Sequence, residues 1–364
     1  MDKITMHIKR SEQRKIITMR KLFAVTFLLL LALPSIAQYG GTAGYQFINL
    51  PNSARNAALG GRIISIMDND LNLALSMPAM LDSTDHDQVV FNYTGYLSDI
   101  NYGTVGYAKY IPEVATFAAS LQYISYGEIA ETDVSGQEIG SLSSGEYMLS
   151  LGAGRQLDEA FSVGSNVKVI LSNLAEYNAS AVALDLSGAY RSKDTFFSAG
   201  LLVRNIGFNI SNYTENGDLS VPFGIDLGLT RKLAKSPLRF SVNFENLQKW
   251  DLTFTDPADL NQVDPLTGQV IELPEESTLE KGMRHVILGS EFILSENFHL
   301  RFGYNFRRRA ELRLEQKPAT SGISWGLGLR ISKFKLNYGR ATYNQAGSTN
   351  HISMTVRLSD FKRG

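Results

Sequence analysis

The chain has 364 residues, with 35 basic and 36 acidic side chains, no cysteine and a mean hydropathy of −0.09. Without cysteine the chain cannot form disulfides, thiol nucleophiles or thiolate-ligated metal centres. The balanced charge argues against a nucleic-acid partner, which requires a basic surface.

The N-terminus predicts a secretory signal peptide over residues 1–37, with Met1 or Met19 as the start. An apolar run at 22–33 follows two basic residues, and residues 35–37 then form a small-x-small cleavage site. This run is shorter than the ~20 apolar residues that a membrane-spanning helix needs, and no comparable run follows it. We therefore expect an exported protein without transmembrane helices.

Residues 38–87 are predicted to form a hatch that contains two short helices. A serine can cap a helix over 53–59, and Asp70 can cap a second helix that ends before Pro78. Two such pieces cannot bury a core of their own, so we expect them inside or beneath the structure that follows. The residues that define this segment are Pro51, Ser53, Arg55, Leu59, Gly60 and Gly61.

From residue 88 onward, apolar and polar side chains alternate with a period of two, which is typical of strands whose faces meet different surroundings. The clearest case is 161–172, where apolar side chains alternate with Ser162, Asn166 and Lys168. Fourteen segments show this pattern: 88–96, 101–110, 115–125, 146–155, 161–172, 179–191, 195–205, 222–231, 238–247, 284–294, 298–307, 322–332, 333–340 and 350–360.

These segments predict an all-β fold, a 14-stranded antiparallel outer-membrane β-barrel over residues 88–361. Their lengths are close to the about 9–11 residues with which a tilted strand crosses a bilayer. Short connections alternate with long polar ones, as periplasmic turns and extracellular loops do. A soluble secreted β protein is the alternative. The long extracellular loops are expected at 126–145, 206–221, 248–283, 308–321 and 341–349.

Charged residues on the polar face of the strands are expected to point into the lumen, because in lipid each would cost about 2–4 kcal/mol at mid-depth. A lumen of this size is too wide for strand side chains alone to fill, so the hatch is expected to plug it. The inward charges are Lys168, Asp185, Arg191, Asp226, Arg239, Glu245, Arg301 and Arg330.

The 248–283 loop is much longer than an ordinary connection, and loops of this length are usually functional or disordered. Apolar side chains on exposed loops favour a partner-binding surface. The alternative is that the loops pack on one another and close the barrel. The candidate contacts are Trp250, Leu252, Phe254, Val270, Ile271 and Leu273 in this loop, with Tyr126 and Tyr213 from two others.

No motif predicts a catalytic, metal or cofactor site. Residues 68–72 resemble the start of a calcium loop but lack its glycine and its final glutamate, so helix capping is the better interpretation. His299 and His351 lie on the polar faces of strands, so a hydrolase with a lumenal Ser/His pair is an alternative. The favoured interpretation is that both histidines are solvated residues of the lumen. The carboxylates of 248–283 could hold a divalent cation against lipopolysaccharide, but a solvated loop is favoured.

One stretch carries a family resemblance. Residues 47–61, FINLPNSARNAALGG, resemble the N-terminal signature of the PorV/PorQ family of the Bacteroidetes type IX secretion system, and of its PorQ branch in particular. Residues 70–75 (DLNLAL), 78–81 (PAML) and 99–103 (DINYG) fit the same family. The family usually has Asn-Pro-Ala where residues 77–79 read Met-Pro-Ala, which affects one helix cap. The similarity extends through essentially the whole mature chain.

The resemblance implies a FadL-like barrel with an N-terminal hatch, surrounded by outer-membrane lipid and lipopolysaccharide. It further implies a non-enzymatic component of the attachment complex, which anchors a PorZ-like surface protein near PorV- and PorU-like components. That complex cleaves cargo and joins it to anionic lipopolysaccharide. A FadL-like channel for hydrophobic small molecules is the alternative function, and an outer-membrane hydrolase is a third.

Overall fold

A computed structural model of the chain describes residues 44–96, 98–214, 217, 219–253, 277–312, 320–344 and 347–361. The predicted signal peptide lies outside these residues. No helix in the described part of the chain is long and apolar enough to cross a membrane.

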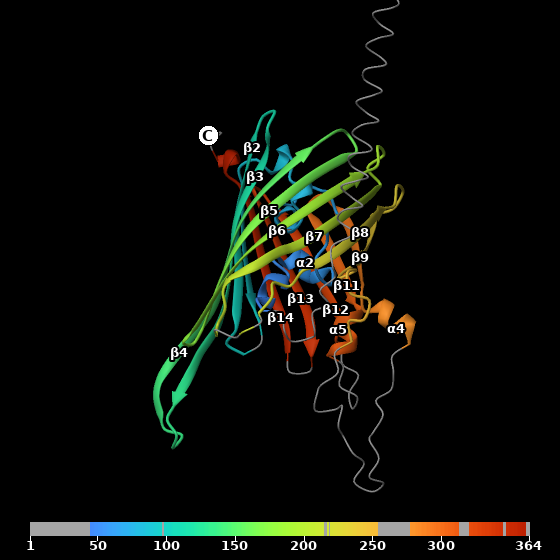
Figure 1. Cartoon of the computed structure of the whole chain (residues 1–364). Coiled ribbons are helices and arrows are strands. Elements are labelled where there is room, and N and C mark those ends of the chain that lie inside the picture. Colours follow the sequence, from blue (N-terminus) through green and yellow to red (C-terminus); the bar gives the residue numbers. More distant parts are fainter. Residues whose placement is uncertain are drawn as a thin grey trace, which may run out of the picture. The chain divides into compact units, whose positions relative to one another are not determined.

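The described strands form one closed antiparallel barrel of fourteen strands (Figure 1). Each strand pairs with its neighbours in sequence, and β14 closes the barrel on β1. The predicted fold class is therefore confirmed. The strands are β1 (Gln88–Gly95), β2 (Asn101–Ile111), β3 (Ala115–Thr132), β4 (Glu138–Gln156), β5 (Phe161–Leu174), β6 (Tyr177–Arg191), β7 (Phe197–Ser211), β8 (Gly224–Lys232), β9 (Leu238–Phe244), β10 (Val286–Ser295), β11 (Phe298–Asn305), β12 (Ile323–Ile331), β13 (Phe334–Asn344) and β14 (Gly347–Arg357).

Short helical elements precede the barrel and flank its longer connections. Five lie before β1, two lie at the ends of long connections, and one follows β14. They are η1 (Gln46–Asn49), α2 (Ala54–Ala58), α3 (Leu71–Ser76), η2 (Pro78–Met80), η3 (Ser83–Asp85), α4 (Thr278–Met283), α5 (Phe306–Glu311) and η4 (Leu358–Phe361).

Several segments predicted as loops belong to strands or helices instead. Residues 126–145 are mostly the far ends of β3 and β4, which form a hairpin beyond the rest of the barrel (Figure 1). Both faces of this hairpin meet water, so its sequence lacks the alternation by which the other strands are predicted. Residues 206–211 continue β7, and 308–321 begins within α5. Residues 341–349 lie mostly in β13 and β14.

The alternation within the strands separates an apolar outer face from a polar lumen. In β5, Val163 and Val167 are exposed on the outside, whereas Asn166 and Lys168 are buried inside. Most of the charges predicted to face inward follow this rule, although Arg330 is exposed near the end of β12. The buried ones are Lys168, Asp185, Asp226, Arg239 and Arg301, while Arg191 and Glu245 are half-buried.

Residues 44–87, called the hatch below, run through the lumen. At one end Gly44 N–H donates to Ser220 O in the long β7–β8 connection, and at the other Tyr107 donates to Asp87 near the short β2–β3 turn. Between these ends the hatch contacts inward-facing residues around the barrel wall, from Asn92 on β1 to Ser353 on β14. Residues 44–87 thus occupy the space that the inner faces of the strands enclose.

Two apolar clusters hold the hatch in place. The first joins α2, α3 and η2, with Leu59, Ile64 and Leu73 fully buried in it. The second lies toward the long-loop end, where Phe47 and Ile48 pack against residues of β2 to β6. Burial of such side chains contributes about 1.5–3 kcal/mol each, so the hatch is an integral part of the core.

Candidate functional site

The short helix α2 begins and ends where its sequence predicts. The Ser53 hydroxyl accepts a hydrogen bond from Asn56 N–H at 3.3 Å, which caps the helix. Gly60 follows the helix at φ +97°, a left-handed conformation that glycine adopts without strain. Asn56 then accepts from Ile63 N–H at 3.2 Å and fixes the turn that leads away from the helix.

Glycines on the barrel wall allow the hatch backbone to approach closely. A Cβ atom on Gly339 of β13 would lie 2.3 Å from Ala54 O, and one on Gly303 of β11 would lie 2.2 Å from Leu59 C. Real Cβ atoms do not approach other atoms so closely, so any larger residue would displace the hatch. The Ser324 hydroxyl of β12 donates to Ala58 O at 3.2 Å between these contacts.

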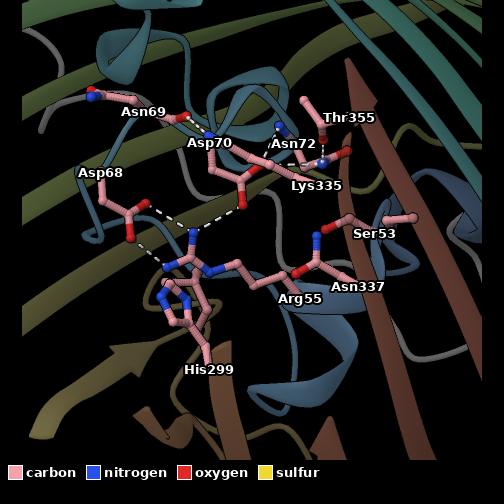
Figure 2. Close-up of polar contacts among 12 residues, drawn as sticks. Ser53, Arg55, Asp68, Asn69, Asp70, Asn72, His299, Lys335, Asn337 and Thr355 are labelled. Carbon is pink, nitrogen blue, oxygen red and sulfur yellow. Dashed lines mark hydrogen bonds and ion pairs between the residues drawn. The ribbon is translucent and has the colours of Figure 1, made fainter. Parts of the chain in front are cut away.

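Arg55 stands at the centre of a buried group of charges (Figure 2). Its guanidinium contacts Asp68 at 2.6 Å and Asp70 at 2.9 Å, both from the hatch. It also contacts Glu291 of β10 at 3.0 Å. Since Asp70 accepts from Asn72 N–H as well, the N-cap of α3 is built into the same group.

The barrel wall supplies the remaining charges. Arg239 of β9 contacts Glu291 at 2.5 Å and Asp68 at 2.7 Å, and Arg301 of β11 contacts Glu291 at 2.8 Å. The Arg55 cluster, defined as Arg55, Asp68, Asp70, Arg239, Glu291 and Arg301, therefore balances three guanidinium groups against three carboxylates. Such a cluster fixes a unique arrangement of the hatch on the wall.

The charge state of Asp68 follows from these contacts. Burial alone would raise its pKa, but the guanidinium groups of Arg55 and Arg239 outweigh burial and hold the pKa well below its usual value. Asp68 is therefore ionised at any physiological pH. The carboxylates of residues 68–72 thus take part in ion pairs and in the cap of α3. Helix capping is the interpretation that the sequence favours over a calcium loop.

A second buried charge group lies on β5 to β8. Lys168 contacts Asp185 at 2.6 Å, and Arg204 contacts Asp226 at 2.8 Å. Strand β7 has a bulge at this point, where two of its residues, Arg204 and Asn205, lie opposite the single residue Asp185 of β6. Asn205 adopts φ +57°, and the side chains of both Arg204 and Asn205 are buried in the lumen. Simple alternation does not predict this bulge, because it places an extra residue in one strand.

The spaces left inside the barrel are small and partly charged. One, beside η2 and the short β4–β5 turn, is lined among others by Asp68, Asp70 and Arg191. Another, between the hatch and the wall, is lined among others by Lys168 and Arg204. Neither is an apolar passage. Among the described residues, no three His, Asp or Glu side chains are placed to hold a metal ion.

The two strand histidines have different surroundings. Both ring nitrogens of His351 are hydrogen-bonded to threonine hydroxyls, Thr94 at 2.9 Å and Thr349 at 2.8 Å. His299 lies beside the Arg55 cluster, 3.5 Å from the Arg301 guanidinium (Figure 2). These contacts give both rings packing roles within the lumen.

The described ends of the 248–283 loop form a closed base. Asp251 and Lys281 make an ion pair at 2.6 Å, and His285 hydrogen-bonds the backbone oxygen of Trp250 at 3.0 Å. The Trp250 side chain is 61% exposed there, and Leu252 is half-buried. Phe254, Val270, Ile271 and Leu273, the other predicted contacts of this loop, lie outside the described residues.

The two predicted tyrosine contacts are half-buried. Tyr126 donates a hydrogen bond to Glu146, and Tyr213 is 2.5 Å from the Ser172 hydroxyl. Both rings pack against the cluster that contains Phe47. The structure thus places these two tyrosines against the apolar cluster between the hatch and the long-loop end of the barrel. Trp250 is not part of that cluster.

Comparison with known proteins gives one family and several similar folds. A family model described as type IX secretion system protein PorV matches residues 37–229. No curated protein sequence matches the chain.

Solved structures similar to this barrel have low sequence identity. The toluene transporter TbuX of Ralstonia pickettii is 11% identical with a TM-score of 0.49, over 85% of this chain and 99% of that chain. The toluene transporter TodX of Pseudomonas putida is 13% identical with a TM-score of 0.48, over 84% and 97%. A FadL homologue of Pseudomonas aeruginosa is 11% identical with a TM-score of 0.44, over 85% and 98%.

Proposed function

This chain belongs to the PorV family of type IX secretion system proteins, and from that premise we propose that it is a non-enzymatic anchor in the attachment complex. It is an outer-membrane component of that secretion system. The proposed partners are a PorZ-like surface protein, held beside PorV- and PorU-like components, and the surrounding lipopolysaccharide. Within the family we assign the chain to the PorQ branch, on the signature at 47–61.

A lumen filled by the hatch supports an anchor over a conduit. The Arg55 cluster and two apolar clusters tie the hatch to strands around the wall. The longest connections between strands lie at one end of the barrel. There the described ends of the 248–283 connection are joined by the Asp251–Lys281 ion pair, and the Trp250 ring beside them is exposed.

Affinity isolation from outer membranes tests the proposal. The tagged full chain is expected to co-purify with PorZ-like and PorU-like proteins. The test variant replaces 254–276 by a short Gly-Ser linker, which keeps the Asp251–Lys281 ion pair at the ends of the connection. This variant should release the PorZ-like partner. The matched control replaces 313–319 in the same way and should retain it. A PorZ-like protein that stays bound without 254–276 would overturn the role of this loop.

Two other functions have their own tests. A channel for hydrophobic molecules would require the hatch to move, and loss of uptake in a deletion strain that still secretes normally would favour it. A hydrolase would require activity of the purified barrel that His299→Ala or His351→Ala abolishes. We expect neither result.

A further inference from the structure

The hairpin formed by the ends of β3 and β4 leaves the barrel with two free edges. β3 pairs with β2 only as far as Ser125, opposite Asn101, and β4 pairs with β5 only from Gly145, opposite Asn173. Beyond these points, residues 126–144, called the β3–β4 arm below, form strand pairs only with each other in the described part of the chain. At the base of the arm, Tyr126 donates to Glu146 and Ser144 accepts from Ala175 N–H. A two-stranded ribbon of this kind is marginally stable alone and exposes unpaired backbone donors and acceptors.

The arm has two register shifts and several acidic side chains, but it lacks the basic residues and prolines with which many free edges are protected. It contains no lysine, arginine or proline, and small side chains such as Ala130 and Ser141 leave its backbone accessible. Near its tip Val134 is fully exposed and Ile139 is 63% exposed. These two side chains add apolar area beside the free edges of the ribbon.

The charges of the arm restrict which molecule that is. All of its ionisable side chains except Tyr126 are acidic, namely Glu128, Glu131, Asp133 and Glu138. A second copy of the arm would bring like charges together, which disfavours self-association. Glu128 and Glu131 lie three residues apart in a regular stretch of β3, so they point to opposite faces of the ribbon. A basic strand added to the arm would therefore find a carboxylate partner on either face.

We propose that the β3–β4 arm docks an extended basic segment of a partner protein, which adds to a free edge as a third strand. Main-chain hydrogen bonds would supply affinity, and the glutamates would select basic side chains. The inference deepens the proposed anchoring function, on which it rests, by naming the chemistry of the segment that binds there.

A peptide experiment on the full chain in lipid nanodiscs tests the arm directly. The probe is a synthetic peptide of alternating lysine and valine, about as long as a strand of eight residues. It should protect amides of 128–132 or 138–143 from hydrogen exchange. Its affinity should fall roughly ten-fold from about 50 to about 500 mM salt, because salt screens exposed charges. A control peptide of the same length, with alternating glutamate and valine, should not bind.

A charge-reversed variant provides the decisive comparison. The triple substitution Glu128→Lys, Glu131→Lys, Glu138→Lys keeps both edges and should reverse the preference between the two peptides. The control Glu159→Lys, exposed in the short β4–β5 turn, should not change it. Equal binding of both peptides, or protection outside the arm, would overturn the inference. The peptide assay does not require the surface partner, so the two proposals can fail separately. Failure of the PorZ-like protein to co-purify would overturn the anchoring function and not the peptide-binding role of the arm.

Discussion

At the scale of single residues, Glu291 has the largest predicted effect because three guanidinium groups converge on it. Arg55, Arg239 and Arg301 all contact its carboxylate, which is 1% exposed. In Glu291→Gln these cations would lose their shared counter-charge within the lumen. We expect a loss of about 3–5 kcal/mol in the free energy of unfolding, the usual cost of breaking a buried ion pair. Urea unfolding of the detergent-solubilised protein measures it.

The pair Arg307–Glu311 provides the matched control, since it has a similar distance of 2.7 Å but both side chains are partly exposed. Glu311→Gln is expected to change the free energy of unfolding by less than about 0.5 kcal/mol. Equal effects of the two substitutions would show that the Arg55 cluster does not hold the hatch.

Asp85 gives a prediction about pH. Burial in η3, helped by nearby Asp82, raises its pKa to about 7. In the unfolded chain the value is about 3.9, so the folded state binds this proton more tightly. The resulting stabilisation is fully present below about pH 4 and is lost as the pH rises from about 4 to about 7.

The thermal midpoint of the protein is therefore expected to fall as the pH rises from about 5 to about 7, and Asp85→Asn should remove most of that fall. Asp133→Asn serves as the control. Hydrogen bonds from Ser135 and Gln137 lower the pKa of Asp133, which keeps it ionised throughout this range. An unchanged pH dependence in Asp85→Asn would exclude Asp85 as its source.

At the scale of elements, the fit of α2 against β13 depends on a missing side chain. A Cβ on Gly339 would lie 2.3 Å from Ala54 O, whereas one on Gly188 in β6 would meet no atom within 4 Å. Gly339→Ala is expected to cost about 1–3 kcal/mol, as overpacking does, and Gly188→Ala to be nearly neutral.

A thiol probe locates the effect in the hatch. The chain has no cysteine, so an engineered Ala57→Cys is its only thiol, and Ala57 is fully buried. Maleimide labelling should accelerate when Gly339→Ala is added and should not when Gly188→Ala is added. Slow labelling of both double variants would mean that α2 tolerates the added methyl group.

The sequence predicts the strands well only where one face of the strand meets lipid and the other meets the lumen. Alternation identifies the strands because lipid and lumen impose opposite chemistry on their faces, as in 161–172. It fails in the β3–β4 arm, where water lies on both faces. Helix α2 is predictable from its own cap and glycine, which are local signals.

The partners of Arg55 are not local. Alternation along β10 places Glu291 on the inner face, but only the register of β9, β10 and β11 brings it to Arg239 and Arg301. The path of the hatch then brings Arg55 to the same carboxylate, from 236 positions away in the sequence. Contacts between such distant segments require the folded barrel.

At the scale of the whole molecule, the hatch determines whether the barrel conducts. A 14-stranded barrel without a plug would enclose a wide lumen. Here the hatch contacts strands around the wall and is held by both apolar clusters. The full chain in a planar bilayer is therefore expected to show almost no ion conductance.

Weakening the attachment of the hatch should open the barrel. Glu291→Gln combined with Gly339→Ala removes the central carboxylate and forces α2 from β13, so intermittent conductance is expected. Replacing 254–276 leaves in place every hatch contact of the described residues, so that variant should stay closed. Steady conductance of the unmodified chain would instead identify the barrel as a channel and favour uptake over anchoring.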